Sequence, residues 1–122
     1  MVVDALLGSG VRGSWARSQL RDGVVAAPPL LALEVTAVVR RLSLRGEVSS
    51  ERAELAVADL RTLAVTRYGS TQLLDGIWRL SGNLTAYDGA YVALAAALGC
   101  ELVTTDLRLA RAPGLPVAVR TP

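Results

Sequence analysis

Three acidic residues lie at positions where a carboxylate could do chemistry. One begins an apolar segment, one ends an apolar segment, and one lies inside an apolar segment. Asp88 opens the helix-like run LTAYDGAYVALAAAL, and Asp106 ends the short strand-like run ELVTT. Glu34 lies in an apolar helical run between Leu33 and Val35, where an unpaired carboxylate is costly to bury. Ligands of open α/β sheets gather at the carboxyl ends of strands, so an acid at such an end is a candidate metal ligand.

Each of these acids also has a structural explanation. Thr85 and Asp88 have the spacing of a capping box, in which Thr85 caps the helix and Asp88 lies in its first turn. Asp106 would cap the short helix that follows its strand. Glu34 would pair with a nearby arginine, although Arg41 lies about two helical turns further on. For Asp88 taken alone, the capping explanation is preferred.

Taken together, the acids are typical of a cation site. Carboxylates that converge at one sheet edge repel one another, which raises their pKa values unless a cation is present. Hard divalent cations such as Mg²⁺ or Mn²⁺ prefer an all-oxygen environment. Such an ion activates water and stabilises the charge that develops in phosphodiester hydrolysis. The convergence itself does not follow from the sequence pattern.

The composition narrows the chemistry that an enzyme of this kind could use. The 122 residues include no histidine, and the 13 basic residues are all arginine. Missing histidine excludes a Ser-His-Asp triad, a Cys-His pair and most zinc sites. Missing lysine excludes the phosphate-loop motif and Schiff-base chemistry. Carboxylates, hydroxyls and arginines remain, and the net charge of +2 permits RNA binding without requiring it.

Length and composition predict a single domain over residues 1–122. No apolar run reaches the ~18–20 residues of a membrane span, and no basic region precedes an apolar core as in a secretory signal. The one cysteine, Cys100, cannot form an internal disulfide. We therefore expect a cytoplasmic protein with no membrane association, in which Cys100 is buried and inert.

Hydrophobic periodicity predicts strands and helices that alternate along the chain. The expected strands are 1–4, 24–27, 63–68, 101–105 and 116–120. The expected helices are 14–20, 30–44, a helix capped by Ser49 or Ser50, 71–80, a helix from Leu84 and 107–110. This alternation indicates an α/β fold with a parallel or mostly parallel sheet and helices on both faces.

Two segments resemble the motifs of a known family. TAYDGAYVALAAALGCELVTTDLRLA is similar to the C-terminal signature of the PIN-domain family in its VapC-type toxin branch, and PPLLALEVTAVVRR resembles the family's second acidic motif. The resemblance runs from about residue 24 to 120. It implies a PIN-like α/β/α sandwich and an Mg²⁺- or Mn²⁺-dependent endoribonuclease. It also implies a homodimer and a small cognate antitoxin that inhibits the enzyme.

The resemblance assigns roles by position. Glu34, Asp88 and Asp106 would be metal-site carboxylates, and Thr104 would orient the site by hydrogen bonding. Apart from the resemblance, Arg108 and Arg111 follow Asp106 in the chain and are the arginines best placed to meet a scissile phosphate.

The N-terminal segment departs from the family pattern, in which a strand ends in Asp and a small hydroxyl residue and a full first helix follow. Here MVVD ends in Asp4, but Ala5 follows and a glycine turn comes at Gly8. In one interpretation Asp4 is the fourth metal-site carboxylate, at the end of a strand. In the other, MVVDALLG is the tail of the first helix, because its apolar residues fit helical spacing, and the true first strand lies upstream.

Two other functions remain open. Without the hydroxyl after Asp4, the chain would be a non-catalytic PIN-like binding module with a damaged or truncated metal site. Alternatively, Gly8, Gly10 and Gly13 spell G-x-G-x-x-G, the dinucleotide-binding fingerprint, which holds a pyrophosphate at a helix N-terminus. The acid expected at the end of the second strand is missing, so a helix stop and a turn explain the glycines better.

Overall fold

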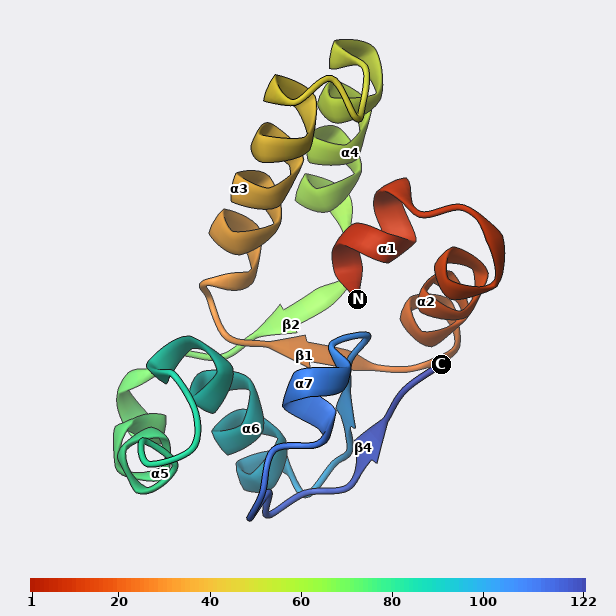
Figure 1. Ribbon diagram of the computed structural model, residues 1–122. Coiled ribbons are helices and arrows are strands. Elements are labelled where there is room, and N and C mark those ends of the chain that lie inside the picture. Colours follow the sequence, from red (N-terminus) through yellow and green to blue (C-terminus); the bar gives the residue numbers. More distant parts are fainter. The chain divides into compact units, whose positions relative to one another are not determined.

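The computed structural model describes residues 1–122, and helices and strands alternate along the chain (Figure 1). The chain divides into two compact units. The first comprises Met1–Val25 and Leu30–Val65, and the second comprises Ala26–Pro29 and Thr66–Pro122. None of the helices combines the length and the apolar character that a bilayer crossing requires.

The first unit contains four helices: α1 (Val2–Leu7), α2 (Gly10–Asp22), α3 (Leu31–Leu44) and α4 (Ser50–Thr62). The predicted helix over 30–44 is confirmed as α3, which buries Leu31, Val35 and Val39 at intervals of one turn. The predicted cap of α4 is also confirmed, because the Ser49 side chain accepts a hydrogen bond from Arg52 N. Helices α3 and α4 lie side by side (Figure 1), and α1 packs against α2, α3 and α4.

The predicted strand at MVVD is wrong, because Val2–Leu7 form helix α1. Val2 and Ala5, three residues apart, are both buried and share one face of this helix. A short apolar run fits a strand and a buried helix equally well, and packing against the neighbouring helices decides between them here. The helical interpretation of this segment is therefore confirmed.

The glycine-rich segment joins two helices. Helix α1 ends just before Gly8, and α2 begins at Gly10, whose φ of 70° favours glycine. Gly13 lies inside α2, where a Cβ atom would be 2.3 Å from the carbonyl oxygen of Gly8. Arg17 Nη1 donates to the carbonyl oxygens of Ala5 (3.2 Å) and Gly8 (2.9 Å), at the C-terminal end of α1. A dinucleotide fingerprint requires a strand before its glycines, so this segment does not form one.

The four strands form two pairs, and each lies within a predicted strand. Strands β1 (Val25–Ala27) and β2 (Val65–Arg67) form one two-stranded sheet. Strands β3 (Leu102–Val103) and β4 (Val119–Arg120) form the other. The second pair is parallel, with Leu102 opposite Val119. The predicted α/β class is therefore confirmed, and the predicted parallel pairing is confirmed for β3 and β4.

Helix α6 is the centre of the second unit. The helices of this unit are η1 (Thr71–Leu73, a 3₁₀ turn), α5 (Leu74–Arg79), α6 (Ala86–Leu98) and α7 (Leu107–Ala110). One buried cluster joins α6 to β3 and α7: Val92, Ala95, Leu102 and Leu109. Another joins α6 to η1: Leu73, Ala93 and Leu94. A helix that is apolar around its circumference is typical of such burial on both sides.

Cys100 is exposed, so the prediction of a buried thiol is wrong. Helix α6 ends at Gly99, which adopts the left-handed conformation with φ of 63°. Cys100 follows this turn and precedes β3, outside both buried clusters.

We predict that Gly13→Ala destabilises the protein by about 1–3 kcal/mol, because the new methyl group must displace the backbone at Gly8. Gly23→Ala is the matched control, since a Cβ atom there would make an ordinary 3.6 Å contact with the Gln19 carbonyl oxygen. Urea unfolding of both variants measures the effect. Equal stability of the two variants would contradict the close approach of α1 and α2.

Candidate metal centre

Asp88 lies in the first turn of α6, where the predicted cap is present. The Thr85 side chain accepts a hydrogen bond of 3.2 Å from the backbone N–H of Asp88. This cap uses the backbone of Asp88, so its carboxylate makes other contacts.

Asp106 lies between β3 and α7, and hydrogen bonds fix both its backbone and its side chain. Its Oδ1 atom accepts hydrogen bonds from Arg108 N (2.8 Å) and Leu109 N (3.2 Å), as expected for the cap of α7. The buried Thr104 accepts a hydrogen bond of 3.0 Å from Asp106 N through its Oγ1 atom. These contacts fix the backbone and one oxygen of Asp106 and leave Oδ2 to face Arg108.

Asp88 and Asp106 converge on one cation. Arg108 Nη2 lies 3.5 Å from Asp88 Oδ2 and 3.6 Å from Asp106 Oδ2. The three residues belong to α6, the β3–α7 junction and α7, all within the second unit. The structure therefore supplies the convergence of these two acids, which the sequence pattern alone does not provide.

The environment of Asp106 favours its charged form. Burial raises the pKa of Asp106, but the backbone N–H groups of Leu109 and Arg108 and the positive charge of Arg108 together outweigh burial. The pKa of Asp106 therefore lies below its ordinary value, and the carboxylate is ionised at neutral pH.

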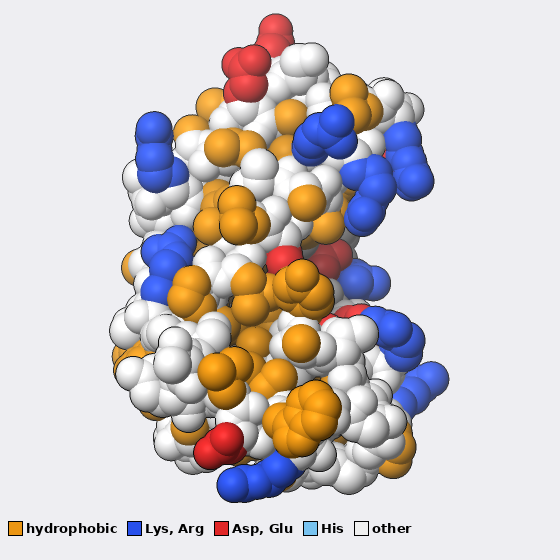
Figure 2. Space-filling view, turned by 90° about the vertical axis from the view of Figure 1, so that its left-hand side faces the viewer, with side chains coloured by type: hydrophobic (Ala, Val, Ile, Leu, Met, Phe, Trp, Pro, Cys, Tyr) orange, Lys and Arg blue, Asp and Glu red, His pale blue; other side chains and the backbone are white.

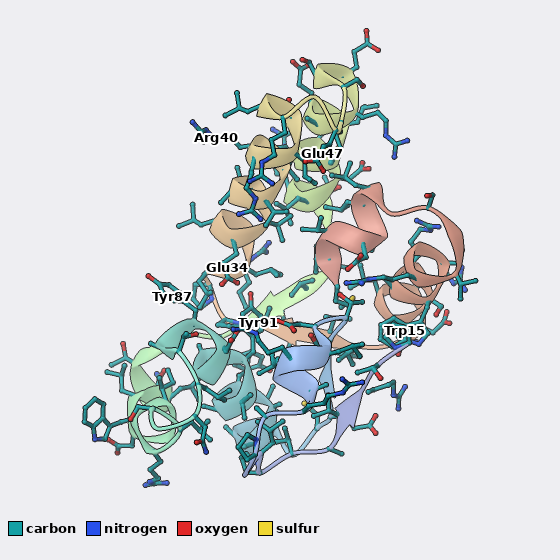
Figure 3. The ribbon with its side chains drawn as sticks, in the orientation of Figure 1. Trp15, Glu34, Arg40, Glu47, Tyr87 and Tyr91 are labelled. Carbon is teal, nitrogen blue, oxygen red and sulfur yellow. The ribbon has the colours of Figure 1, made fainter.

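The other two predicted carboxylates lie in the first unit. Glu34 is half-buried in the first turn of α3, and Figure 3 shows it at the N-terminal end of that helix. Asp4 lies within α1, where it pairs with the N-terminal amine of Met1 (3.3 Å) and with Arg12 Nε (2.9 Å). Asp4 does not end a strand, so the premise for its assignment is wrong. The structure contains no group of three or more acidic or cysteine side chains that could hold a metal ion. In the second unit, Asp88 and Asp106 come together as a pair around Arg108.

Sequence reasoning missed the contact of Arg108 with both acids. The sequence indicates only that Arg108 follows Asp106 closely enough to meet a phosphate. The cap of α7 turns the chain so that the Arg108 side chain reaches back to the site. An arginine two residues after a capping aspartate is a signal that could have indicated this contact.

The PIN-domain family model matches residues 2–115 of this chain. The chain belongs to the PIN-domain family. Ribonuclease VapC1 of Mycobacterium tuberculosis strain H37Rv is 44% identical over 120 residues, which cover 98% of this chain and 90% of that protein. Ribonuclease VapC9 of the same strain is 40% identical over 111 residues, which cover 89% and 87%. Ribonuclease VapC3 is 36% identical over 111 residues, covering 91% and 81%. The resemblance to the VapC-type branch of this PIN-domain family is confirmed.

We predict that Asp106→Ala destabilises the protein at neutral pH by about 0.5–2 kcal/mol, because the first turn of α7 loses its cap. Asp106→Asn keeps an oxygen acceptor for Arg108 N and Leu109 N and is less destabilising. Urea unfolding at pH 7 measures both variants. Equal destabilisation by the two substitutions would contradict the capping role.

The pH dependence of the Asp106→Asn variant has a definite sign. The pKa of Asp106 is lowered in the folded protein, so its charge contributes stability above the unfolded pKa of about 4 and loses this contribution as the pH falls through the lowered value. The stability difference between the natural protein and Asp106→Asn therefore narrows below about pH 4, as urea unfolding at successive pH values would show. A difference that widens on acidification would contradict the lowered pKa.

Proposed function

We propose that this chain is a metal-dependent endoribonuclease that hydrolyses RNA phosphodiester bonds and acts as the toxin of a toxin–antitoxin pair. The observation that carries the proposal is the convergence of Asp88 and Asp106 on one cation-binding point. The family supports it, because the relatives described above are named ribonucleases. The non-catalytic and dinucleotide-binding alternatives have no comparable support.

The donor atoms of the acid pair fit a hard divalent cation. Asp88 Oδ2 and Asp106 Oδ2 are carboxylate oxygens from separate elements, and both already lie near one positive charge. Mg²⁺ and Mn²⁺ prefer oxygen ligands of this kind. We propose that Asp88 and Asp106 hold the ion, with Glu34 as a third carboxylate and Thr104 as the residue that positions Asp106. Asp4 remains a prediction, without support from its place in α1.

The residues of the second unit have distinct tasks in this mechanism. When bound, a divalent ion supplies Lewis-acid activation for phosphodiester hydrolysis. Thr104 and the first turn of α7 keep Asp106 Oδ2 directed at the ion-binding point. Tyr87 extends from the first turn of α6, beside Asp88, and is 65% exposed (Figure 3). Its ring offers a surface on which an RNA base can stack.

We predict that Asp88→Asn reduces RNA cleavage by more than the ~10–100-fold that outer-shell changes at metal sites typically produce, because the cation loses a charged ligand. The fold is retained, because the Thr85 cap uses the backbone of residue 88. The assay compares cleavage of RNA with Mn²⁺, with Mg²⁺ and with EDTA, and circular dichroism checks the fold.

Asp75→Asn is the matched control for Asp88→Asn. Asp75 is exposed in the first turn of α5, so the change is the same and the position on a helix of the same unit is comparable. Cleavage by Asp75→Asn should match the natural protein. Undiminished cleavage by a folded Asp88→Asn variant would overturn the assignment of the site.

Three broader properties complete the proposal. Both units belong to one PIN domain, which is supported by the single family model that covers residues 2–115. The chain forms a homodimer and acts in the cytoplasm, as the resemblance to VapC-type toxins implies. Light scattering of the purified chain measures its mass in solution, and a monomer at all concentrations would contradict the homodimer.

The helix pair of the first unit offers a surface for the cognate antitoxin. A groove of about 360 Å³ is lined by residues of α3 and α4: Thr36, Val39, Arg40, Ser43, Leu44, Ala53, Glu54 and Val57. Figure 2 shows hydrophobic side chains on the face of this helix pair that α3 presents to the viewer, and Leu44 of α3 is 71% exposed. An apolar groove between two helices fits the apolar face of an amphipathic helix. We propose that an antitoxin helix occupies this groove.

We predict that Leu44→Asp weakens antitoxin binding by at least about tenfold, because a charge replaces apolar surface inside the interface. The partner in this test is the cognate antitoxin, and calorimetry measures its affinity. Leu74→Asp is the control, since Leu74 lies on α5 and is 57% exposed. Weakening by Leu74→Asp but not by Leu44→Asp would move the antitoxin away from the α3–α4 groove.

A further inference from the structure

Arg108 makes an unusual pair of contacts. One nitrogen atom, Nη2, lies within 4 Å of a carboxylate oxygen of both Asp88 and Asp106. Charge-assisted hydrogen bonds are typically about 2.7–2.9 Å long, and both distances of this nitrogen are greater. The Arg108 side chain is also 79% exposed. The guanidinium is therefore held by the charge of two carboxylates, and water has access to it.

The two carboxylates need a positive charge whether or not a metal ion is bound. Asp88 and Asp106 are held close by the buried cluster that joins α6, β3 and α7 and by the cap that Asp106 Oδ1 forms on α7. Two carboxylates that each lie within 4 Å of the same nitrogen atom repel each other, and Arg108 offsets that repulsion. A divalent cation on the same oxygens offsets it more strongly, and it would also repel the guanidinium. The arginine and the ion are thus competitors for the same pair of oxygens.

We propose that Arg108 is an internal counter-ion that occupies the cation position between Asp88 and Asp106 in the metal-free protein and is displaced when a divalent ion binds. This inference rests on the proposed function, because it assumes that the acid pair is a metal site. Once displaced, the exposed Arg108 guanidinium would be available to contact the phosphate of a bound RNA. Arginine is well suited to this second contact, since its planar fork matches the oxygens of a phosphate.

If Arg108 competes with the metal ion, replacing Arg108 should raise the affinity for the ion. Replacing a residue that binds the ion would lower that affinity. Removing a competing positive charge near both carboxylates should tighten Mn²⁺ binding about 5–30-fold, which corresponds to about 1–2 kcal/mol. A residue that merely supports the fold would weaken binding or leave it unchanged when replaced.

The experiment is a calorimetric titration of the EDTA-treated, dialysed full chain with Mn²⁺, for the natural protein and for Arg108→Gln. Arg111→Gln is the matched control, because it also removes one positive charge. Arg111 lies about one helical turn after Arg108, and its side chain contacts neither carboxylate. Tighter Mn²⁺ binding by Arg108→Gln and unchanged binding by Arg111→Gln are expected. Unchanged or weaker binding by Arg108→Gln would overturn the counter-ion.

A second measurement separates the counter-ion from a defect in folding. In EDTA, Arg108→Gln should melt at a lower temperature than Arg111→Gln, because the acid pair has lost its positive partner. Saturating Mn²⁺ should remove this difference, since the ion then neutralises the same oxygens. A difference that persists at saturating Mn²⁺ would overturn the proposal. Failure of the natural protein to bind Mn²⁺ would overturn the metal centre itself, so the two failures are distinguishable.

Discussion

The burial of α6 on both sides is the constraint on which the second unit depends. One face of this helix packs on β3 and α7 and another packs on η1, so the helix cannot rotate or slide without disturbing a core cluster. Small residues make this possible. A Cβ atom at Gly76 of α5 would lie 3.2 Å from Ala93, and one at Gly89 would lie 3.4 Å from Ile77. The first turn of α6, with Asp88, is positioned by apolar contacts further along the helix.

The same core fixes Asp106 relative to Asp88. Leu102 of β3 and Leu109 of α7 belong to the cluster that holds α6, and Asp106 lies between them in the chain. The apolar interior thus brings together two carboxylates that repel each other. Hydrophobic burial offsets the free-energy cost of this repulsion. Because the two negative charges lie close together, the pair attracts a cation.

Local patterns in the sequence predict the parts of this structure that local interactions determine. The spacing of Thr85 and Asp88 predicts the cap of α6, and the position of Asp106 predicts the cap of α7. The periodicity of 30–44 predicts α3 almost to the residue. In each case the interacting residues lie within one or two helical turns of each other, so their spacing in the sequence is enough to predict the contact.

The parts that the sequence does not predict depend on contacts between distant segments. Four apolar or acidic residues at MVVD fit a strand or a helix, and the packing of Val2 and Ala5 against neighbouring helices decides the outcome. The exposure of Cys100 depends on the turn at Gly99 and on where β3 begins. The meeting of Asp88, Asp106 and Arg108 requires three elements to be assembled, and the residue types alone do not specify it. Family resemblance indicated the acids because it carries information about that assembly.

The two carboxylate oxygens of Asp106 have different contacts. Oδ1 caps α7, and Oδ2 faces the Arg108 guanidinium. An aspartate codon becomes an asparagine codon by one base change, and asparagine retains the capping oxygen while it loses the charge. At the proposed metal site, a single substitution would therefore remove the ligand charge without dismantling the architecture of the chain. The substituted chain would still fold, because the capping oxygen of residue 106 is retained. Stability and metal binding are thus separable at Asp106, because its two oxygens have different contacts.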